Sequence, residues 1–230
     1  MEDATHAPPG TDLMACDPVT ALRDRLLDAA LDEAPFHGWT RSGLARAAVA
    51  AGLTPGEAML AAPGGPGDLI DHWAARVDAA VARAIADAGG LKIRQKAALA
   101  VRTRVLAYAP HKEALRRALV ALALPVHGTL VARLGWRAAD TAWRAMGDTA
   151  TDFNWYTKRT ILMAVQGSSL AYWMQDSSED HAPTFAFIDR RIENVMQFEK
   201  VKAQVQKAAA RLPDPVALLT RLRYGPQPRP

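Results

Sequence analysis

Apolar residues recur at intervals of three and four along most of the chain, which is the spacing of one face of an α-helix. Alanine and leucine dominate these repeats, and runs of β-branched residues are scarce. The pattern therefore predicts an all-α protein without strands. The expected helices cover residues 19–34, 41–51, 54–62, 68–88, 91–108, 115–124, 126–134, 136–146, 153–175 and about 185–211.

The first three predicted helices are short, and a glycine-rich turn separates them from a longer fourth helix. This is the order of a helix-turn-helix module followed by a ligand-binding body. Thr54 can cap the third helix, with Pro55 at its first position, and Asp68 can cap the fourth. Residues 44–56 resemble the N-terminal domain of TetR-type transcriptional regulators, and the resemblance extends over about the first 75 residues.

The third predicted helix lacks the side chains that read DNA. Residues 54–62 contain Glu57 as their only charge and no Arg, Lys, Asn or Gln. Contacts to base edges and phosphates need hydrogen-bond donors, and the downstream Asp68 and Asp71 would repel a phosphate backbone. We therefore expect no specific DNA binding, and interpret the module as a retained fold with a lost activity.

Three strings in the second half of the chain carry a more specific resemblance. They read GDTATDFNWYTKR at 147–159, YWMQDSS at 172–178 and FAFIDRRI at 185–192. They resemble the Coq-nine family of accessory proteins in ubiquinone biosynthesis. The resemblance implies a TetR-like fold, a homodimer, binding of an isoprenoid quinone precursor or phospholipid, and assistance to the di-iron hydroxylase of that pathway.

Aromatic residues gather around the predicted helix at 153–175. Trp136, Trp143, Trp155 and Trp173, four of the six tryptophans, fall within one short stretch. Small residues on the helix leave space beside these rings, which either another helix or a ligand must fill. With the family resemblance we expect a lipid tunnel rather than a filled core. Its candidate lining is Trp143, Met146, Leu162, Val165, Ser169, Tyr172, Trp173, Phe185, Ile188 and Ile192.

The start of the same helix carries a candidate docking site. The resemblance implies that the Trp155-Tyr156 pair belongs to a surface patch that docks the hydroxylase, and we add Asp152 and Asn154 beside it. Aromatic anchors near a charged rim are typical of interface hot spots. The alternative is a structural pair packed on a dimer or tunnel wall.

Basic residues concentrate on the predicted helix at 91–108, whose charged positions are all Lys or Arg, and from Lys200 to the end. Leu219, Arg221, Leu222 and Arg223 are the candidate membrane contacts, because a helix there places the leucines near one face with the arginines at its flanks. The resemblance implies an amphipathic C-terminal helix. This chain differs from the family pattern because Pro213 and Pro215 interrupt the segment. A solvated basic tail is the alternative.

The sequence contains no recognisable pattern of catalytic residues. The six histidines are scattered without metal-ligand spacing, and Asp148 with Asp152 lacks further ligands one helical turn away. Residues 63–67 are glycine-rich but lack the Lys-Ser/Thr of a phosphate loop. The single cysteine, Cys16, excludes an intrachain disulfide. We expect no enzyme, no metal and no cofactor.

The sequence thus predicts a lipid-binding accessory protein of ubiquinone biosynthesis that presents a quinone intermediate to the hydroxylase. A TetR-type regulator that senses a hydrophobic ligand and a scaffold with a filled core are the alternatives. No run approaches 18 apolar residues, so we expect a cytoplasmic protein, peripheral on the inner face of a bacterial inner membrane. The expected parts are a disordered tail (1–18), a degenerate helix-turn-helix-type module (19–66), a lipid-binding and dimerisation domain (67–211) and a basic amphipathic tail (212–230).

Overall fold

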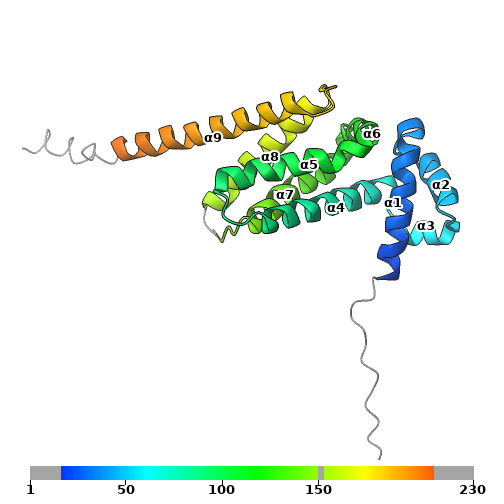
Figure 1. The fold of residues 1–230 in the computed structure, drawn as a ribbon. Coiled ribbons are helices and arrows are strands. Elements are labelled where there is room, and N and C mark those ends of the chain that lie inside the picture. Colours follow the sequence, from blue (N-terminus) through cyan, green and yellow to red (C-terminus); the bar gives the residue numbers. More distant parts are fainter. Residues whose placement is uncertain (1–16, 150–152, 210–230) are drawn as a thin grey trace, which may run out of the picture.

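The computed structural model describes residues 17–149 and 153–209, and within them the fold is helical without strands (Figure 1). The prediction of an all-α protein is confirmed. The elements are α1 (Pro18–His37), α2 (Arg41–Ala50), α3 (Pro55–Ala61), α4 (Pro66–Asp87), α5 (Ile93–Tyr108), the 3₁₀ turn η1 (Ala109–His111), α6 (Lys112–Leu122), the 3₁₀ turn η2 (Pro125–His127), α7 (Gly128–Ala145), α8 (Phe153–Trp173) and α9 (Ala182–Ala209).

Three predicted helix boundaries are wrong. Helix α1 continues past Pro35 to His37, and Gly38, at φ 65°, ends it by donating its N–H to the Ala34 carbonyl. Helix α4 begins at Pro66, so Asp68 lies in its first turn and accepts from the Gly64 N–H at 2.6 Å instead of capping it. The two helices expected at 126–134 and 136–146 form one helix, α7, after the turn η2.

Gly135 lies in the middle of α7, at the point where α7 packs closely against α8. A Cβ at this position would lie 2.9 Å from the Met163 sulfur on α8, so glycine allows the two helices to approach closely. The glycine therefore marks a helix contact and not the helix break that the sequence suggested.

Helices α1, α2 and α3 form a small module at one end of the molecule (Figure 1). Thr54 caps α3 as predicted, and Glu57 completes a capping box with it. The arginines of α1 serve this packing: Arg23 Nε donates to the Ala61 carbonyl at 2.7 Å, and Arg25 Nη2 donates to the Ala51 carbonyl at 2.8 Å. These side chains cap the C-terminal ends of α3 and α2. Their hydrogen-bond donors are therefore engaged within the module and do not face a phosphate backbone.

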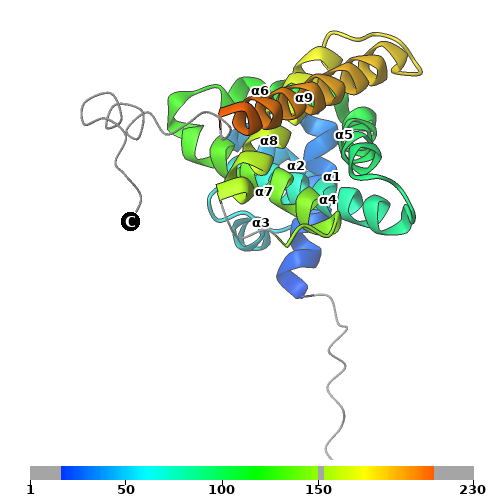
Figure 2. The same cartoon turned by 90° about the vertical axis from the view of Figure 1, so that its left-hand side faces the viewer.

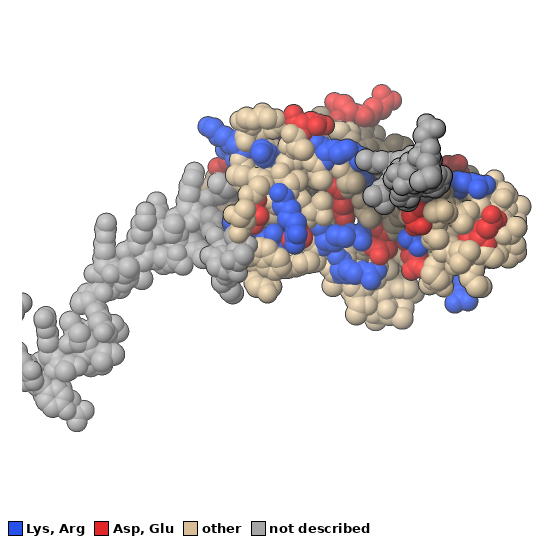
Figure 3. All heavy atoms as spheres, turned by 90° about the horizontal axis from the view of Figure 1, so that it is seen from below, with Lys and Arg blue, Asp and Glu red and all other residues tan. Residues whose placement is uncertain are grey.

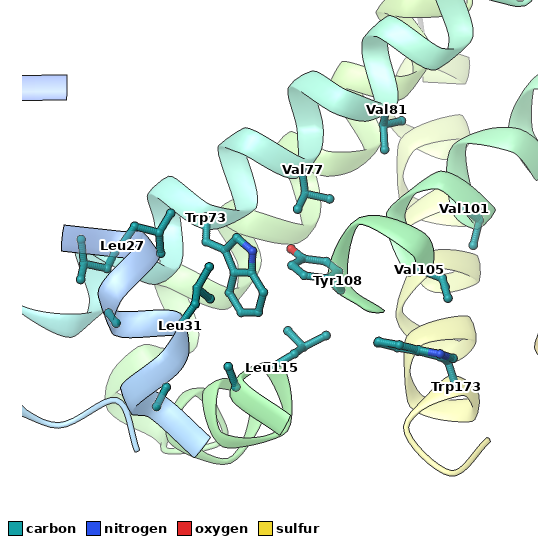
Figure 4. Close-up of a cluster of buried hydrophobic side chains, with 14 of the residues drawn as sticks. Leu27, Leu31, Trp73, Val77, Val81, Val101, Val105, Tyr108, Leu115 and Trp173 are labelled. Atoms are coloured by element: carbon teal, nitrogen blue, oxygen red, sulfur yellow. The ribbon is translucent and has the colours of Figure 1, made fainter. Parts of the chain in front are cut away.

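Helices α4 to α9 form the body, in which α9 lies across α8 and beside α5 (Figure 2). The core runs without a break from the module into the body (Figure 4). At the junction Trp73 of α4 packs edge-on against Tyr108 of α5, with ring centroids 4.8 Å apart. Trp39, which follows α1, donates its indole N–H to the Ala114 carbonyl of α6 at 2.9 Å.

A buried ionic network joins α4, α5 and α7. Asp78 of α4 is 4% exposed and accepts from Arg104 of α5 at 2.5 Å and from Arg137 of α7 at 2.9 Å. Arg137 also donates to the carboxylate and the backbone carbonyl of Asp71, which lies about two helical turns nearer the start of α4. Burial raises the pKa of the neighbouring Tyr108 phenol. The network fixes the three helices against one another.

The turn between α8 and α9 is organised by one carboxylate. Asp176 accepts hydrogen bonds from the backbone N–H and the hydroxyl of both Ser178 and Thr184. These bonds, led by the Ser178 hydroxyl, hold the pKa of the Asp176 carboxyl well below its usual range. Lys112 of α6 donates to the Asp176 carbonyl, which ties the turn to the body.

Candidate functional site

An apolar pocket of about 260 Å³ lies between α5, α7, α8 and α9. Most of its wall is aliphatic, whereas Arg94 and Lys158 supply its charges. Such a composition suits a hydrocarbon chain. The lining residues are Ile93, Arg94, Ala97, Trp143, Thr157, Lys158, Ile161, Leu162, Val165, Ile192 and Val195.

A wider and more open groove of about 670 Å³ adjoins this pocket, because Arg94 and Ile192 line both. It runs between α5 and α9, and two ion pairs link its walls. Arg94 lies 3.2 Å from Glu193, and Arg102 lies 2.6 Å from Asp189. The pocket and the groove are therefore neighbours that share one wall residue of α5, Arg94, and one of α9, Ile192.

The arginines of the basic helix predicted at 91–108 form ion pairs within the fold. Arg94, Arg102 and Arg104 of α5 pair with acidic residues of α9 and α4. Basic and acidic side chains also alternate across the face shown in Figure 3. The excess of positive charge in the α5 sequence is therefore largely used for helix packing.

The structure brings together four of the ten predicted lipid-binding residues at the pocket: Trp143, Leu162, Val165 and Ile192. The others have two kinds of environment. Tyr172 lies on the outer face of α8, 37% exposed and stacked on Phe187 with ring centroids 4.4 Å apart. The remaining five are buried or partly buried in the core next to the pocket: Met146, Ser169, Trp173, Phe185 and Ile188.

The small residues of α8 lie mainly on its outer face. Ala164, Gly167 and Ala171 are exposed, whereas Ser168 is half-buried and Ser169 is buried, and a Cβ added to Gly167 would meet no atom within 4 Å. The space that the sequence suggested beside the aromatic rings is therefore an open helix face rather than an enclosed tunnel.

An aromatic cluster forms on the surface at the junction of α7 and α8. Trp155 packs against Tyr156 and against Trp136 of α7, with centroids 4.7 Å and 5.2 Å apart. Tyr156 is 58% exposed. We name Trp136, Trp155 and Tyr156 the aromatic patch. Sequence reasoning missed Trp136, because its proximity to Trp155 arises only when α7 and α8 pack together.

A buried arginine supports the aromatic patch from below. Arg159 is 1% exposed, and its guanidinium carbon lies 4.1 Å from the centre of the Trp155 ring. It donates to Asp140 at 2.7 Å, to Asp148 at 3.1 Å and to the Trp155 carbonyl. Lys158 pairs with the other oxygen of Asp148 at 2.7 Å. Asp148 is therefore a salt-bridge residue that links the patch to the pocket wall.

Several predicted residues lie outside the described part of the chain. Asp152 belongs to the gap at 150–152, and the side chain of Asn154 is not described. The membrane-contact candidates Leu219, Arg221, Leu222 and Arg223 lie beyond residue 209.

Among the described residues, no group of three or more His, Cys, Asp or Glu side chains is arranged to hold a metal ion. In the same residues no single helix is long and apolar enough to span a membrane. One sharply bent pair, Ile93–Leu122 with Pro125–Ala145, passes that test by length and composition alone.

The arrangement defines the class of the protein as a TetR-like helical fold. A crystal structure of the TetR transcriptional regulator from Nitrosomonas europaea ATCC 19718 superposes with a TM-score of 0.60 at 19% sequence identity. The match covers 75% of this chain and 97% of the regulator. At this identity the likeness shows the shared fold alone.

Sequence comparison then gives the family. The COQ9 family model matches residues 129–199, which hold α7, α8 and most of α9 with the aromatic patch. The human "Ubiquinone biosynthesis protein COQ9, mitochondrial" is 30% identical over 225 residues, covering 91% of this chain and 70% of the human protein. The rat protein of the same name is 32% identical over 200 residues, covering 83% of this chain and 64% of the rat protein. The chain belongs to the COQ9 family.

Proposed function

We propose that this protein is a lipid-binding accessory protein of ubiquinone biosynthesis. It holds an isoprenoid quinone intermediate in the pocket between α5, α7, α8 and α9 and presents it to a di-iron hydroxylase. The observation that carries the proposal is the aliphatic pocket itself, which adjoins the groove between α5 and α9. The names of the curated relatives support the pathway.

The energetics of the pocket favour a prenyl chain. Burial of a methylene group contributes about 0.8 kcal/mol, so one fully buried isoprene unit contributes at most roughly 3–4 kcal/mol. Arg94 and Lys158 are ion-paired with Glu193 and Asp148, which leaves the mouth close to neutral. This suits a ligand without a formal charge.

The aromatic patch is the proposed docking site for the hydroxylase. Its rings are packed against one another and held from below by Arg159, so little conformational freedom is lost when a partner covers them. Asp148 pairs both with Arg159 beneath Trp155 and with Lys158 in the pocket wall, which supports docking of the partner close to the bound lipid.

A homodimer and a membrane contact complete the proposal. The exposed small residues of α8 suit close packing against the same helix of a second copy. The apolar and basic residues Leu219, Arg221, Leu222 and Arg223 are proposed to touch the inner face of the bacterial inner membrane, where lipid enters the groove.

A DNA-binding regulator is the weaker function. The surface of α3 presents Met59 and Leu60, 71% and 61% exposed, where a DNA reader needs donors. The Arg23 and Arg25 side chains nearby cap helix ends.

The proposed function is tested by extraction of the purified full-length protein with organic solvent and mass spectrometry of the extract. We expect a prenylated quinone or quinone precursor at a substantial fraction of one molecule per chain. A control protein purified from the same cells by the same steps should lack it. Recovery of no prenyl lipid above that control would contradict the proposal.

A further inference from the structure

Exposed aliphatic side chains gather at the place where α6 meets α7. The helical segments Ile93–Leu122 and Pro125–Ala145 are bent by 99° there, and the turn η2 lies at the bend. The side chains are 40% to 77% exposed, so water covers much of their surface. We name five of them the apolar corner: Leu119, Val120, Leu124, Val126 and Val131.

Charged residues are absent from the corner itself and lie at both of its flanks. Residues 118–132 contain no Asp, Glu, Lys or Arg, and the half-buried His127 is their one ionisable side chain. Arg116 and Arg117 precede the corner and Arg133 follows it, with side chains 48%, 51% and 63% exposed. An apolar surface with a basic border is typical of proteins that touch an anionic membrane.

The basic border keeps an excess of positive charge after its ion pairs are considered. Arg116 and Arg117 share the carboxylate of Glu113, at 3.1 Å and 3.3 Å. Arg133 lies 2.8 Å from Asp71, a carboxylate that the buried network of α4 and α7 also uses. The border therefore has fewer carboxylates than guanidinium groups.

A groove next to the corner leaves this balance unchanged. It lies between α6, α7 and the start of α4, with Val126 in its wall. The other helices contribute Arg41 and Asp68 to it, one residue of each sign. Among the described residues, the surroundings of the corner thus remain basic.

The corner suits contact with a membrane surface rather than passage through a bilayer. The opposite faces of the two helices belong to the core, where Ala118 of α6 and Ala139 of α7 are fully buried. Only the outer faces are available to lipid. Insertion is therefore limited to the boundary between headgroups and acyl chains.

A second copy of this chain fits the corner less well than lipid does. A two-fold contact would place the basic border of one copy against the same border of the other. Like charges that face each other oppose association. The corner also lacks the Trp and Tyr side chains that dominate protein interfaces. Lipid phosphates, in contrast, complement the arginines.

We propose that the apolar corner inserts its side chains into the surface of an anionic membrane, with the flanking arginines at the lipid phosphates. This contact goes beyond the proposed function, which places the membrane at residues 219–223. Ala132 beside the corner and Trp136 of the aromatic patch are one turn apart on α7. A partner docked on the patch is therefore brought close to the same membrane.

Flotation of the full-length protein with vesicles tests this contact. The vesicles contain phosphatidylcholine alone or together with phosphatidylglycerol. Val126→Asp puts a carboxylate into the corner and should weaken binding to the anionic vesicles by about tenfold. Val49→Asp makes the same change at a 79% exposed site on α2 and should float as the native protein does. Both sites are exposed, so neither variant should change the melting temperature.

A second variant tests the basic border. Arg117→Gln removes one exposed charge and keeps a long polar side chain. We expect binding to vesicles with phosphatidylglycerol to weaken by about threefold to fivefold, because the arginine meets the lipid phosphates. Binding to phosphatidylcholine alone should not change.

A fluorescent label reports insertion directly. Cys16 is replaced by serine, so that a single new cysteine, Val126→Cys or Val49→Cys, carries the environment-sensitive dye NBD. We expect anionic vesicles to shift the NBD emission to shorter wavelength at residue 126 and to leave it unchanged at residue 49.

Three outcomes would overturn the contact. They are no flotation of the native protein, native flotation by Val126→Asp, and NBD emission at residue 126 that does not respond to vesicles. A shift at residue 126 that follows protein concentration without vesicles would assign the corner to contact between copies, and would also overturn the proposal. Extraction of the bound lipid, which tests the proposed function, does not depend on flotation, so the two can fail separately.

Discussion

Replacing Asp78 with alanine is expected to lower the free energy of unfolding by about 3–5 kcal/mol. Asp78 is 4% exposed and neutralises Arg104, which is 3% exposed, so the substitution leaves a buried cation without its partner. It also removes one of the two carboxylates that hold Arg137. Urea denaturation followed by circular dichroism measures the change.

Asp28→Ala is the matched control for this prediction. Asp28 of α1 pairs with Arg76 at 2.6 Å, but both side chains are well exposed to solvent. An exposed pair of this kind contributes about 0–1 kcal/mol. If Asp78→Ala costs no more than Asp28→Ala, the buried network does not hold α4, α5 and α7 together.

Replacing Trp155 with alanine is expected to weaken binding of the hydroxylase by about 30-fold or more, the effect of losing a hot-spot residue of at least 2 kcal/mol. Trp155 is the central ring of the aromatic patch, in contact with both Trp136 and Tyr156. The hydrogen bonds of Arg159 to Asp140 and Asp148 do not involve the Trp155 side chain, so the fold should persist. Co-purification of the two proteins measures the loss.

Tyr172→Ala provides the control for docking, because Tyr172 is an exposed aromatic residue on the same helix outside the patch. It should co-purify with the hydroxylase as the native protein does. Circular dichroism and lipid content should match the native protein in both variants. Undiminished binding by Trp155→Ala would contradict the docking proposal, and loss of its helical signal would show that Trp155 is structural.

The fold was predictable from local features that act within a few residues. The Thr54 cap of α3 and the periodic apolar stripes of α1 and α4 depend on short-range geometry, so the sequence predicts them well. The errors occurred where distant packing overrides a local signal. Gly135 suggested a helix break, but its contact with Met163 shows that its role lies in the approach of α8.

The candidate site was predictable only in part. Helices α7, α8 and α9 contributed four predicted residues to the pocket, whereas Ile93, Arg94 and Ala97 of α5 were not foreseen. Their role follows from the packing of α5 against α8 and α9, which a periodic pattern does not specify. The burial of Arg159 beneath Trp155 was not predictable, because it depends on the packing of the folded chain.

The most direct test of the central claim is a titration of the protein with a short-chain prenyl quinone, measured through quenching of the tryptophans that include Trp143 in the pocket wall. Val165→Phe adds a ring inside the pocket, whereas Val120→Phe makes the same change at a 69% exposed site on α6. We expect saturable binding by the native protein and Val120→Phe, and binding at least tenfold weaker by Val165→Phe. If Val165→Phe binds the quinone as tightly as Val120→Phe, the lipid does not occupy this pocket.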